Sequence, residues 1–310
     1  MTQKFRFGIQ TSNAGSPGEW AAKARRIEEL GFSTLFIPDH FTEQLAPIPA
    51  LVAAANATST LRVGTLVLDN DYRHPLVLAK EWATLDVLSA GRTELGVGAG
   101  WMRSDYEQSG IPLDPPGVRI KRFREGLRIV KGLFADGPFS FAGEFYTVTE
   151  HEGTPKPVQQ PHPPILIGGG GKRVLSIAAR EADIVGVNFS LAEGEVNPKV
   201  AVTGSAAATR EKIQWIRDAA GDRFDELELN VTVFFTVVTD DRQAMAERLA
   251  PGFGLTPEDV LSSPHVAIGT ADQIAESLQR HREEYGFSYI VFSGDVFDAI
   301  APVVARLAGT

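Results

Sequence analysis

The sequence predicts an α/β protein, a single (β/α)8 barrel of the TIM type that spans residues 1–310. Two observations lead to this fold class. A unit of strand, loop and helix recurs about every 30 residues, and eight segments of the chain have the character of strands. Buried strands that alternate with helices favour a parallel sheet covered by helices, and eight strands close such a sheet into a barrel.

The eight strands are recognised as short apolar or β-branched runs. We expect them at residues 5–10, 33–38, 61–68, 92–98, 164–168, 183–188, 227–238 and 288–293. Helices are predicted between them where apolar residues recur at helical spacing, as in the helix that Pro17 opens and Gly31 ends. The others are expected at 47–58, 75–88, 117–134, 172–181, 205–220, 242–249 and 270–285, with a last helix that runs to Leu307.

Two segments interrupt this repeat, one after the fourth strand and one before the fifth. Residues 104–117 and 138–164 are rich in proline, and both are predicted to be irregular loops. Long connections in a compact barrel are usually lids or binding loops. A doubly wound open sheet is the competing architecture, but the first strand is not followed by the Gly-x-Gly-x-x-Gly turn of a dinucleotide fold.

Composition excludes several classes of function. The net charge of −9, from 39 acidic and 30 basic residues, disfavours nucleic-acid binding, which depends on clustered cations. The absence of cysteine excludes disulfides and thiolate chemistry and favours the cytoplasm. No apolar stretch is long enough to span a membrane, and the N-terminus does not resemble a signal peptide.

Active sites of such barrels form from the loops that follow the strands, so the residues at these positions are the candidates. Asp39 and His40 follow the second strand, where a histidine can exchange a proton or donate a hydrogen bond. Asp69 follows the third strand, within a polar stretch that ends at Pro75. For each of these residues a turn or a helix cap is the alternative interpretation.

Glycines follow the fourth and fifth strands. Gly98 and Ala99 precede Trp101, and a glycine there would allow the backbone to approach a flat ring that Trp101 could stack on. After the fifth strand come Gly168, Gly169, Gly170 and Gly171, then Lys172 and Arg173 at the start of a helix. This is the most specific local pattern, because free backbone N–H groups at a helix N-terminus bind phosphate. A flexible turn is the alternative.

Other catalytic machinery is missing from the sequence. The six histidines have no metal-binding spacing, and there is no Gly-x-Ser-x-Gly elbow for a serine nucleophile. A phosphate-binding turn and a histidine at the barrel mouth, without a nucleophile or a metal, favour chemistry supplied by a cofactor.

Several ordered motifs resemble the luciferase-like monooxygenase family. They are Arg73-His74-Pro75, the run from Thr84 to Arg92, the run from Leu95 to Trp101, Gly143-Glu144-Phe145-Tyr146, Pro155-Lys156-Pro157-Val158-Gln159, and the run from Pro163 to Gly170. The resemblance covers nearly the whole chain.

This resemblance implies a barrel that holds a flavin or a deazaflavin ring at its mouth. The chain is more similar to the branch that uses coenzyme F420, in which the residues matched by Asp39 and His40 lie beside the ring. It also implies a non-prolyl cis peptide near Leu66 and Val67, with Asp69 contacting the ring. Trp101 stands where the sugar-phosphate dehydrogenases of this branch have a glutamate acid, which argues against that reaction.

The sequence therefore predicts an F420-dependent oxidoreductase in which Asp39 and His40 are catalytic and a small-molecule substrate lies against Trp101, Ser104 and Asn188. An FMN-dependent monooxygenase that uses reduced flavin and oxygen is the first alternative. A non-catalytic flavin-binding barrel is the second. The family resemblance also implies a homodimer.

Overall fold

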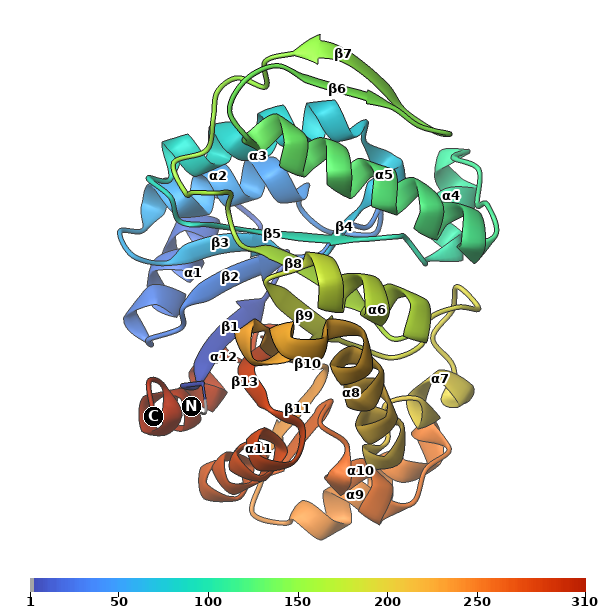
Figure 1. Cartoon of the computed structure of the whole chain (residues 1–310). Coiled ribbons are helices and arrows are strands. Elements are labelled where there is room, and N and C mark those ends of the chain that lie inside the picture. The colour runs from blue at the N-terminus through green and yellow to red at the C-terminus, as the bar shows by residue number, and fades with distance from the viewer. Residues whose placement is uncertain (1–2) are drawn as a thin grey trace.

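The computed structural model describes residues 3–310 and contains a closed parallel barrel (Figure 1). The strands of the barrel are β1 (Arg6–Gln10), β2 (Thr34–Ile37), β3 (Arg62–Thr65), β4 (Leu68–Asp69), β5 (Thr93–Gly98), β8 (Ile165–Gly169), β9 (Ile184–Val187), β10 (Glu228–Val233) and β13 (Phe287–Ser293). β3 and β4 occupy one position, since both pair with β5, and β1 closes the barrel by pairing in parallel with β13. The predicted eight-stranded barrel is confirmed.

Helices follow the strands and surround the barrel (Figure 1). They are α1 (Pro17–Glu29), α2 (Pro47–Ala57), α3 (Pro75–Leu88), α5 (Pro116–Phe134), α6 (Lys172–Glu181), α8 (Ala206–Ala220), α11 (Ala271–Tyr285) and α12 (Phe297–Leu307). Local sequence explains where they begin. Ser16 caps α1 ahead of Pro17, and Thr270 forms a capping box with Gln273 at the start of α11.

The predicted strand 227–238 is wrong in one respect, because it consists of two strands in different sheets. β10 ends at Val233, and β11 (Phe235–Val238) pairs with β12 (Val266–Gly269) outside the barrel. With α9 (Arg242–Phe253) and α10 (Pro257–Ser262), this pair has a small apolar core of its own. The apolar run is continuous along the chain, so nothing in it marks the change of strand partner.

Both predicted loops contain regular structure. Residues 103–109 form α4 (Arg103–Ser109), which ends at Gly110 with a φ of 74°. The second segment contains an antiparallel hairpin of β6 (Phe139–Ala142) and β7 (Thr147–His151), which lies outside the barrel beyond α3 and α5 (Figure 1). Tertiary contacts hold both elements, which is why their short local patterns did not predict them.

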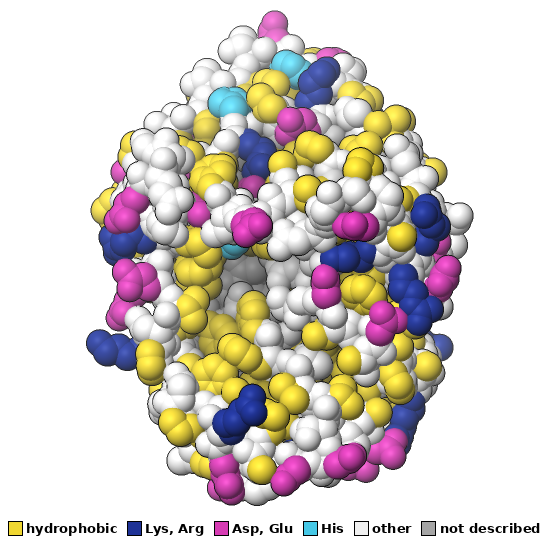
Figure 2. Space-filling view, turned by 180° about the vertical axis from the view of Figure 1, so that it is seen from behind, with side chains coloured by type: hydrophobic (Ala, Val, Ile, Leu, Met, Phe, Trp, Pro, Cys, Tyr) yellow, Lys and Arg dark blue, Asp and Glu magenta, His cyan; other side chains and the backbone are white. Residues whose placement is uncertain are grey.

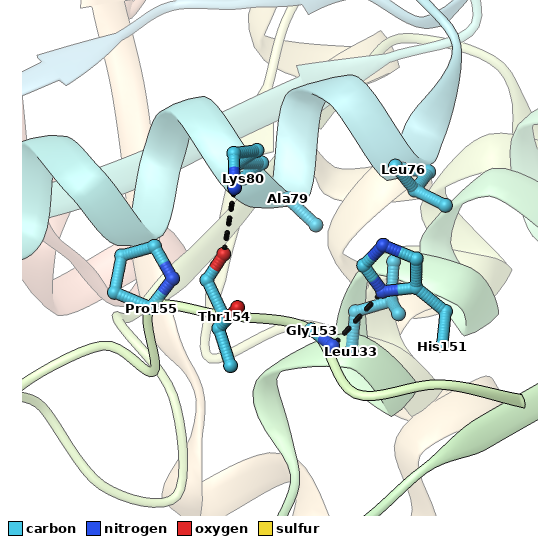
Figure 3. Close-up of a pocket in the computed structure, with 8 residues that line it drawn as sticks. All are labelled: Leu76, Ala79, Lys80, Leu133, His151, Gly153, Thr154 and Pro155. Carbon is cyan, nitrogen blue, oxygen red and sulfur yellow. Dashed lines mark hydrogen bonds between the residues drawn. The ribbon is translucent and has the colours of Figure 1, made fainter.

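The hairpin and the chain that follows it are attached to α3. Lys80 donates a hydrogen bond to the carbonyl oxygen of Thr154 at 3.1 Å, and His151 accepts one from the backbone of Gly153 at 2.9 Å (Figure 3). The cavity between these residues has a volume of about 10 Å³. This is room for a single water molecule and not for a substrate.

Charged side chains close the N-terminal end of the barrel. The carboxylate of Glu94 is fully buried and contacts Arg6, Arg62 and the hydroxyl of Tyr289. Burial alone would raise the pKa of Glu94, but the two guanidinium groups hold it below its usual value. The open cavity lies at the opposite end of the barrel.

Candidate active site

A cavity of about 550 Å³ lies at the C-terminal ends of the barrel strands. This volume is in the range of small-molecule and cofactor sites. On one face of the molecule, the surface is hollowed near its middle, and hydrophobic side chains gather along one side of the hollow (Figure 2). The predicted site residues that line the cavity are Asp39, His40, Leu66, Val67, Asp69, Gly98, Ala99, Trp101, Gly168, Gly169, Gly170, Gly171 and Asn188.

Three predicted site residues do not line the cavity. Lys172 and Arg173 begin α6 with exposed side chains, and Ser104 is exposed on α4. Ser104 was expected to face the substrate from a loop. The helical turn that replaces this loop instead directs its neighbour Asp105 inward, where Asp105 is buried.

The carboxylate of Asp39 is fully engaged by its neighbours. Its Oδ1 accepts a hydrogen bond from Arg73 Nη2 at 3.0 Å, and its Oδ2 accepts one from the backbone of Asp69 at 3.0 Å. Desolvation opposes the charge of Arg73, but hydrogen bonding to Asp39 holds the pKa of Arg73 above its usual value. Asp39 therefore contacts the end of β4 and is paired with Arg73, which does not itself line the cavity.

His40 is oriented by a carboxylate that the sequence did not reveal. Its Nδ1 lies 2.7 Å from Asp105 Oδ2, and the other oxygen of Asp105 accepts a hydrogen bond from the backbone of Phe41 at 3.2 Å. The rings of His40 and Trp101 meet edge to face with centroids 5.6 Å apart. A carboxylate on Nδ1 fixes the orientation of the ring and leaves Nε2 as the nitrogen available to a ligand. Nothing in the local pattern indicated this contact, because residues 104–117 were predicted to be an irregular loop.

The break between β3 and β4 contains a cis peptide bond between Leu66 and Val67, where the family resemblance implies one. Gln10 Nε2 donates to the carbonyl oxygen of Leu66 at 2.7 Å. A Cβ atom at Gly98 would lie 2.8 Å from Val67 Cγ2. Close packing against this bulge therefore explains the glycine at position 98, which was expected to make room for a ring.

The four glycines pass from β8 into α6. Gly171 is the N-cap residue of α6 and provides no side-chain cap, so N–H groups of the first helical turn are free to bind an anion. A side chain at Gly170 would collide with the backbone of Phe189, whereas nothing lies within 4 Å of a Cβ at Gly171. The glycine turn of residues 168–171 is thus tightly packed at Gly170 and open at Gly171.

The chain after β9 covers part of the cavity. Phe189, Leu191 and Val196 line it, and this segment continues through α7 (Pro198–Val202). At its outer end, the carbonyl oxygen of Gly194 accepts a hydrogen bond from the backbone of Arg103 at 3.1 Å. The segment of residues 189–203, which we call the cover segment, therefore reaches from β9 to α4.

A buried lysine joins the two ends of the cover segment. Lys212 Nζ donates to the carbonyl oxygens of Asn188, at 2.6 Å, and of Thr203. Burial lowers the pKa of Lys212 to about 8.

Asp69 is a buried acidic group whose pKa departs clearly from its usual value. Burial, together with the nearby carboxylates of Asp71 and Asp39, raises the pKa of Asp69 to about 7, although hydrogen bonds from Asp71 and Tyr106 oppose the shift. Across residues 3–310 no group of acidic or histidine side chains is arranged to hold a metal ion. In the same range no helix is both long and apolar enough to cross a bilayer.

This fold and site define a class of protein. The sequence profile described as luciferase-like monooxygenase matches residues 2–284, which is most of the chain. The chain belongs to the luciferase-like monooxygenase family.

Individual relatives in this family use two kinds of cofactor. The chain is 30% identical over 264 residues to the F420-dependent glucose-6-phosphate dehydrogenase of Nakamurella multipartita, an alignment that covers 82% of this chain and 74% of that one. It is 30% identical over 186 residues to the FMNH2-dependent dimethylsulfone monooxygenase of Pseudomonas putida, covering 58% of this chain and only 50% of the relative.

A solved structure gives the same fold over the full length. The coenzyme F420-dependent tetrahydromethanopterin reductase of Methanopyrus kandleri superposes with a TM-score of 0.77 and covers 99% of both chains, at 19% identity.

Proposed function

We propose that the protein is an F420-dependent oxidoreductase that transfers a hydride to or from a small organic molecule. One observation carries the proposal: the glycine turn before α6, the bulge at Leu66 and Val67, and His40 line the same cavity. The proposal is further supported by the F420-dependent relative, whose alignment covers a larger share of the chain than that of the FMNH2-dependent relative.

The residues of the cavity fit a cofactor of this type. The N–H groups in the first turn of α6, which no side chain caps at Gly171, suit a phosphate, and the helix dipole favours a negative charge there. The apolar wall at Leu66, Val67 and Val174 suits the flat ring. The bound deazaflavin would supply the hydride chemistry.

The remaining residues would orient the reactants and exclude water. His40, held by Asp105 at Nδ1, would present Nε2 to the reactants, and Trp101 and Asn188 would contact the substrate. The cover segment would close the site against solvent. Holding reactants together in a water-excluded cavity lowers the barrier without any covalent contribution from the protein.

Direct titration of the purified protein with coenzyme F420 and with FMN, followed by fluorescence, tests the identity of the cofactor. We expect micromolar binding of F420 and weaker binding of FMN. Micromolar binding of FMN without F420 binding would contradict the proposal and favour the FMN-dependent monooxygenase. Binding without turnover of any donor would favour the non-catalytic barrel.

Substitution of Gly171, the open position of the glycine turn, tests whether this turn binds the phosphate of the cofactor. Gly171→Glu places a negative charge beside the free amides of α6 and is expected to weaken cofactor binding at least tenfold, which corresponds to about 1.4 kcal/mol. Gly171→Gln is the matched control, because it adds a similar volume without charge and should bind within about threefold of the wild type. Equal affinities of the two variants would place the phosphate elsewhere.

We also propose that the protein is a homodimer, as the family resemblance implies, and that it is cytoplasmic, which the absence of cysteine favours. Sedimentation at micromolar concentration would test the assembly, and a species of 33.5 kDa, the mass of one chain, would contradict it.

A further inference from the structure

Asp69 belongs to a chain of hydrogen bonds that begins at the cavity. The residue lines the cavity and is 7% exposed. Tyr106 Oη lies 2.9 Å from Asp69 Oδ2 and 3.1 Å from Asp71 Oδ2, so that one hydroxyl joins two carboxyl groups. Behind Asp71, Arg122 contacts both Asp71 and the partly exposed Asp114. This series of hydrogen bonds and ion pairs therefore runs from the cavity toward the surface.

The number of protons shared by Asp69, Tyr106 and Asp71 determines the net charge of this hydrogen-bonded group. A phenol carries one proton and can donate it to one carboxylate only. Both contacts of Tyr106 are satisfied only if one of the two carboxyl groups is itself protonated and donates to the phenol oxygen. Asp71 is paired with Arg122, whose Nε donates to Asp71 Oδ1 at 2.8 Å. No Lys or Arg nitrogen of residues 3–310 lies within ion-pair distance of Asp69, so the proton belongs to Asp69.

The other charges around Asp69 lead to the same assignment. Arg73 is paired with Asp39, and Asp39 accepts the backbone N–H of Asp69, so a negative group faces Asp69 from β2. Arg119, on α5, donates to the carbonyl oxygen of Gly100 at 2.6 Å. Buried beside two carboxylates and without a cation of its own, Asp69 is more stable as a neutral acid.

We propose that Asp69 is a neutral carboxylic acid that supplies the proton accompanying hydride transfer, with Tyr106 stabilising the carboxylate that remains. The inference rests on the proposed function. In the direction of reduction, a bound reduced cofactor would supply a hydride, with its electron pair, to an electrophilic carbon of the substrate. The hydrogen bond from Asp69 to Tyr106 breaks as the conjugated heteroatom takes the proton of Asp69, and the hydroxyl of Tyr106 then turns from Asp71 to donate to the carboxylate of Asp69. A proton from solvent then restores the acid.

The first test is made on the protein without cofactor. Infrared difference spectra recorded as the pH is raised from about 5 to about 9 should show the loss of a protonated carboxyl band, with a midpoint near 7. This band should be absent in Asp69→Asn and present in Asp218→Asn, which removes an exposed carboxylate from α8. A band that persists in Asp69→Asn, or no band in the wild type, would overturn the assignment.

Tyr106→Phe provides a second, independent variant. It removes the hydroxyl that stabilises ionised Asp69, so the midpoint of the band should move to higher pH. An unchanged midpoint would show that Tyr106 does not stabilise the ionised form.

Delivery of the proton is tested by single-turnover oxidation of reduced F420 on the protein, with menadione, a quinone that takes up one hydride and one proton. We expect Asp69→Asn to be slower than the wild type by a factor of about 10² to 10⁴, with Asp218→Asn unchanged. Equal rates for Asp69→Asn and the wild type would overturn the role in delivery. A wild type that binds no F420 would contradict the proposed function and leave the infrared assignment standing.

Discussion

At the scale of single residues, the contacts of Asp39 and Asp69 separate two acids that have similar positions in the sequence. Asp39 comes soon after β2, Asp69 is the last residue of β4, and both line the cavity. Asp39 is paired with Arg73, whereas Asp69 has a hydroxyl and a backbone amide as its partners. An ion pair keeps a carboxylate charged, and burial without a cation keeps it neutral. We therefore propose a positioning role for Asp39, which the sequence predicted to be catalytic, and the acid role for Asp69.

Asp39→Asn should lower the free energy of unfolding by about 3 kcal/mol, because Arg73 would lose its charged partner in a largely buried position. Urea denaturation would measure this. Asp298→Asn is the control, since its ion pair with Arg26 is exposed and should contribute less than about 1 kcal/mol. Similar losses in the two variants would show that the Asp39 pair does not stabilise the fold.

At the scale of secondary-structure elements, loops and short helices complete the site that the barrel strands begin. α4 brings Asp105 to His40 and Tyr106 to Asp69. The cover segment contributes Phe189 and Val196 and is held at both ends by Lys212. Few buried apolar side chains hold this segment, so its order depends on a small number of hydrogen bonds.

Lys212→Met should loosen the cover segment more than the barrel. Two carbonyl groups would lose their donor, which costs about 1–3 kcal/mol each when no water replaces it. We expect faster amide hydrogen exchange in residues 189–203, unchanged exchange in β1 and β13, and weaker cofactor binding. Lys199→Met, an exposed position on α7, is the control. Uniformly faster exchange in all strands would contradict a local role.

At the scale of the whole molecule, three buried groups make stability depend on pH in opposite directions. Burial lowers the pKa of His265 to about 3 and that of His281 to about 4. Both stay neutral in the fold but take up a proton in the unfolded chain, so their contribution is lost as the pH falls below about 6.5. Asp69 acts in the opposite sense. Its stabilising contribution is present at low pH and is lost as the pH rises through about 7.

His281→Phe should make the unfolding free energy less sensitive to acid. Between pH 6.5 and about 4 the slope should fall by about 1.4 kcal/mol per pH unit, the value for one proton. The ring of Tyr285 lies 5.8 Å away and can pack against the new ring. Urea denaturation across this range measures the slope, and an unchanged slope would mean that His281 is protonated in the fold.

The barrel was predictable from the sequence because its signals are local. Apolar runs such as 33–38, prolines at helix starts such as Pro17, and the glycines at 168–171 each specify backbone conformation within a few residues. These signals were sufficient for the eight strand positions and for the placement of His40 and the glycine turn at one end of the barrel.

Only the tertiary structure decided which side chains meet. Asp105 lies 65 residues from His40, Tyr106 lies 37 residues from Asp69, and β11 pairs with a strand that no periodic pattern indicated. Such contacts depend on how distant elements pack, and so does the protonation of a buried acid. Composition and spacing place a carboxyl group at the barrel mouth, but its partners in space determine whether it carries a proton there.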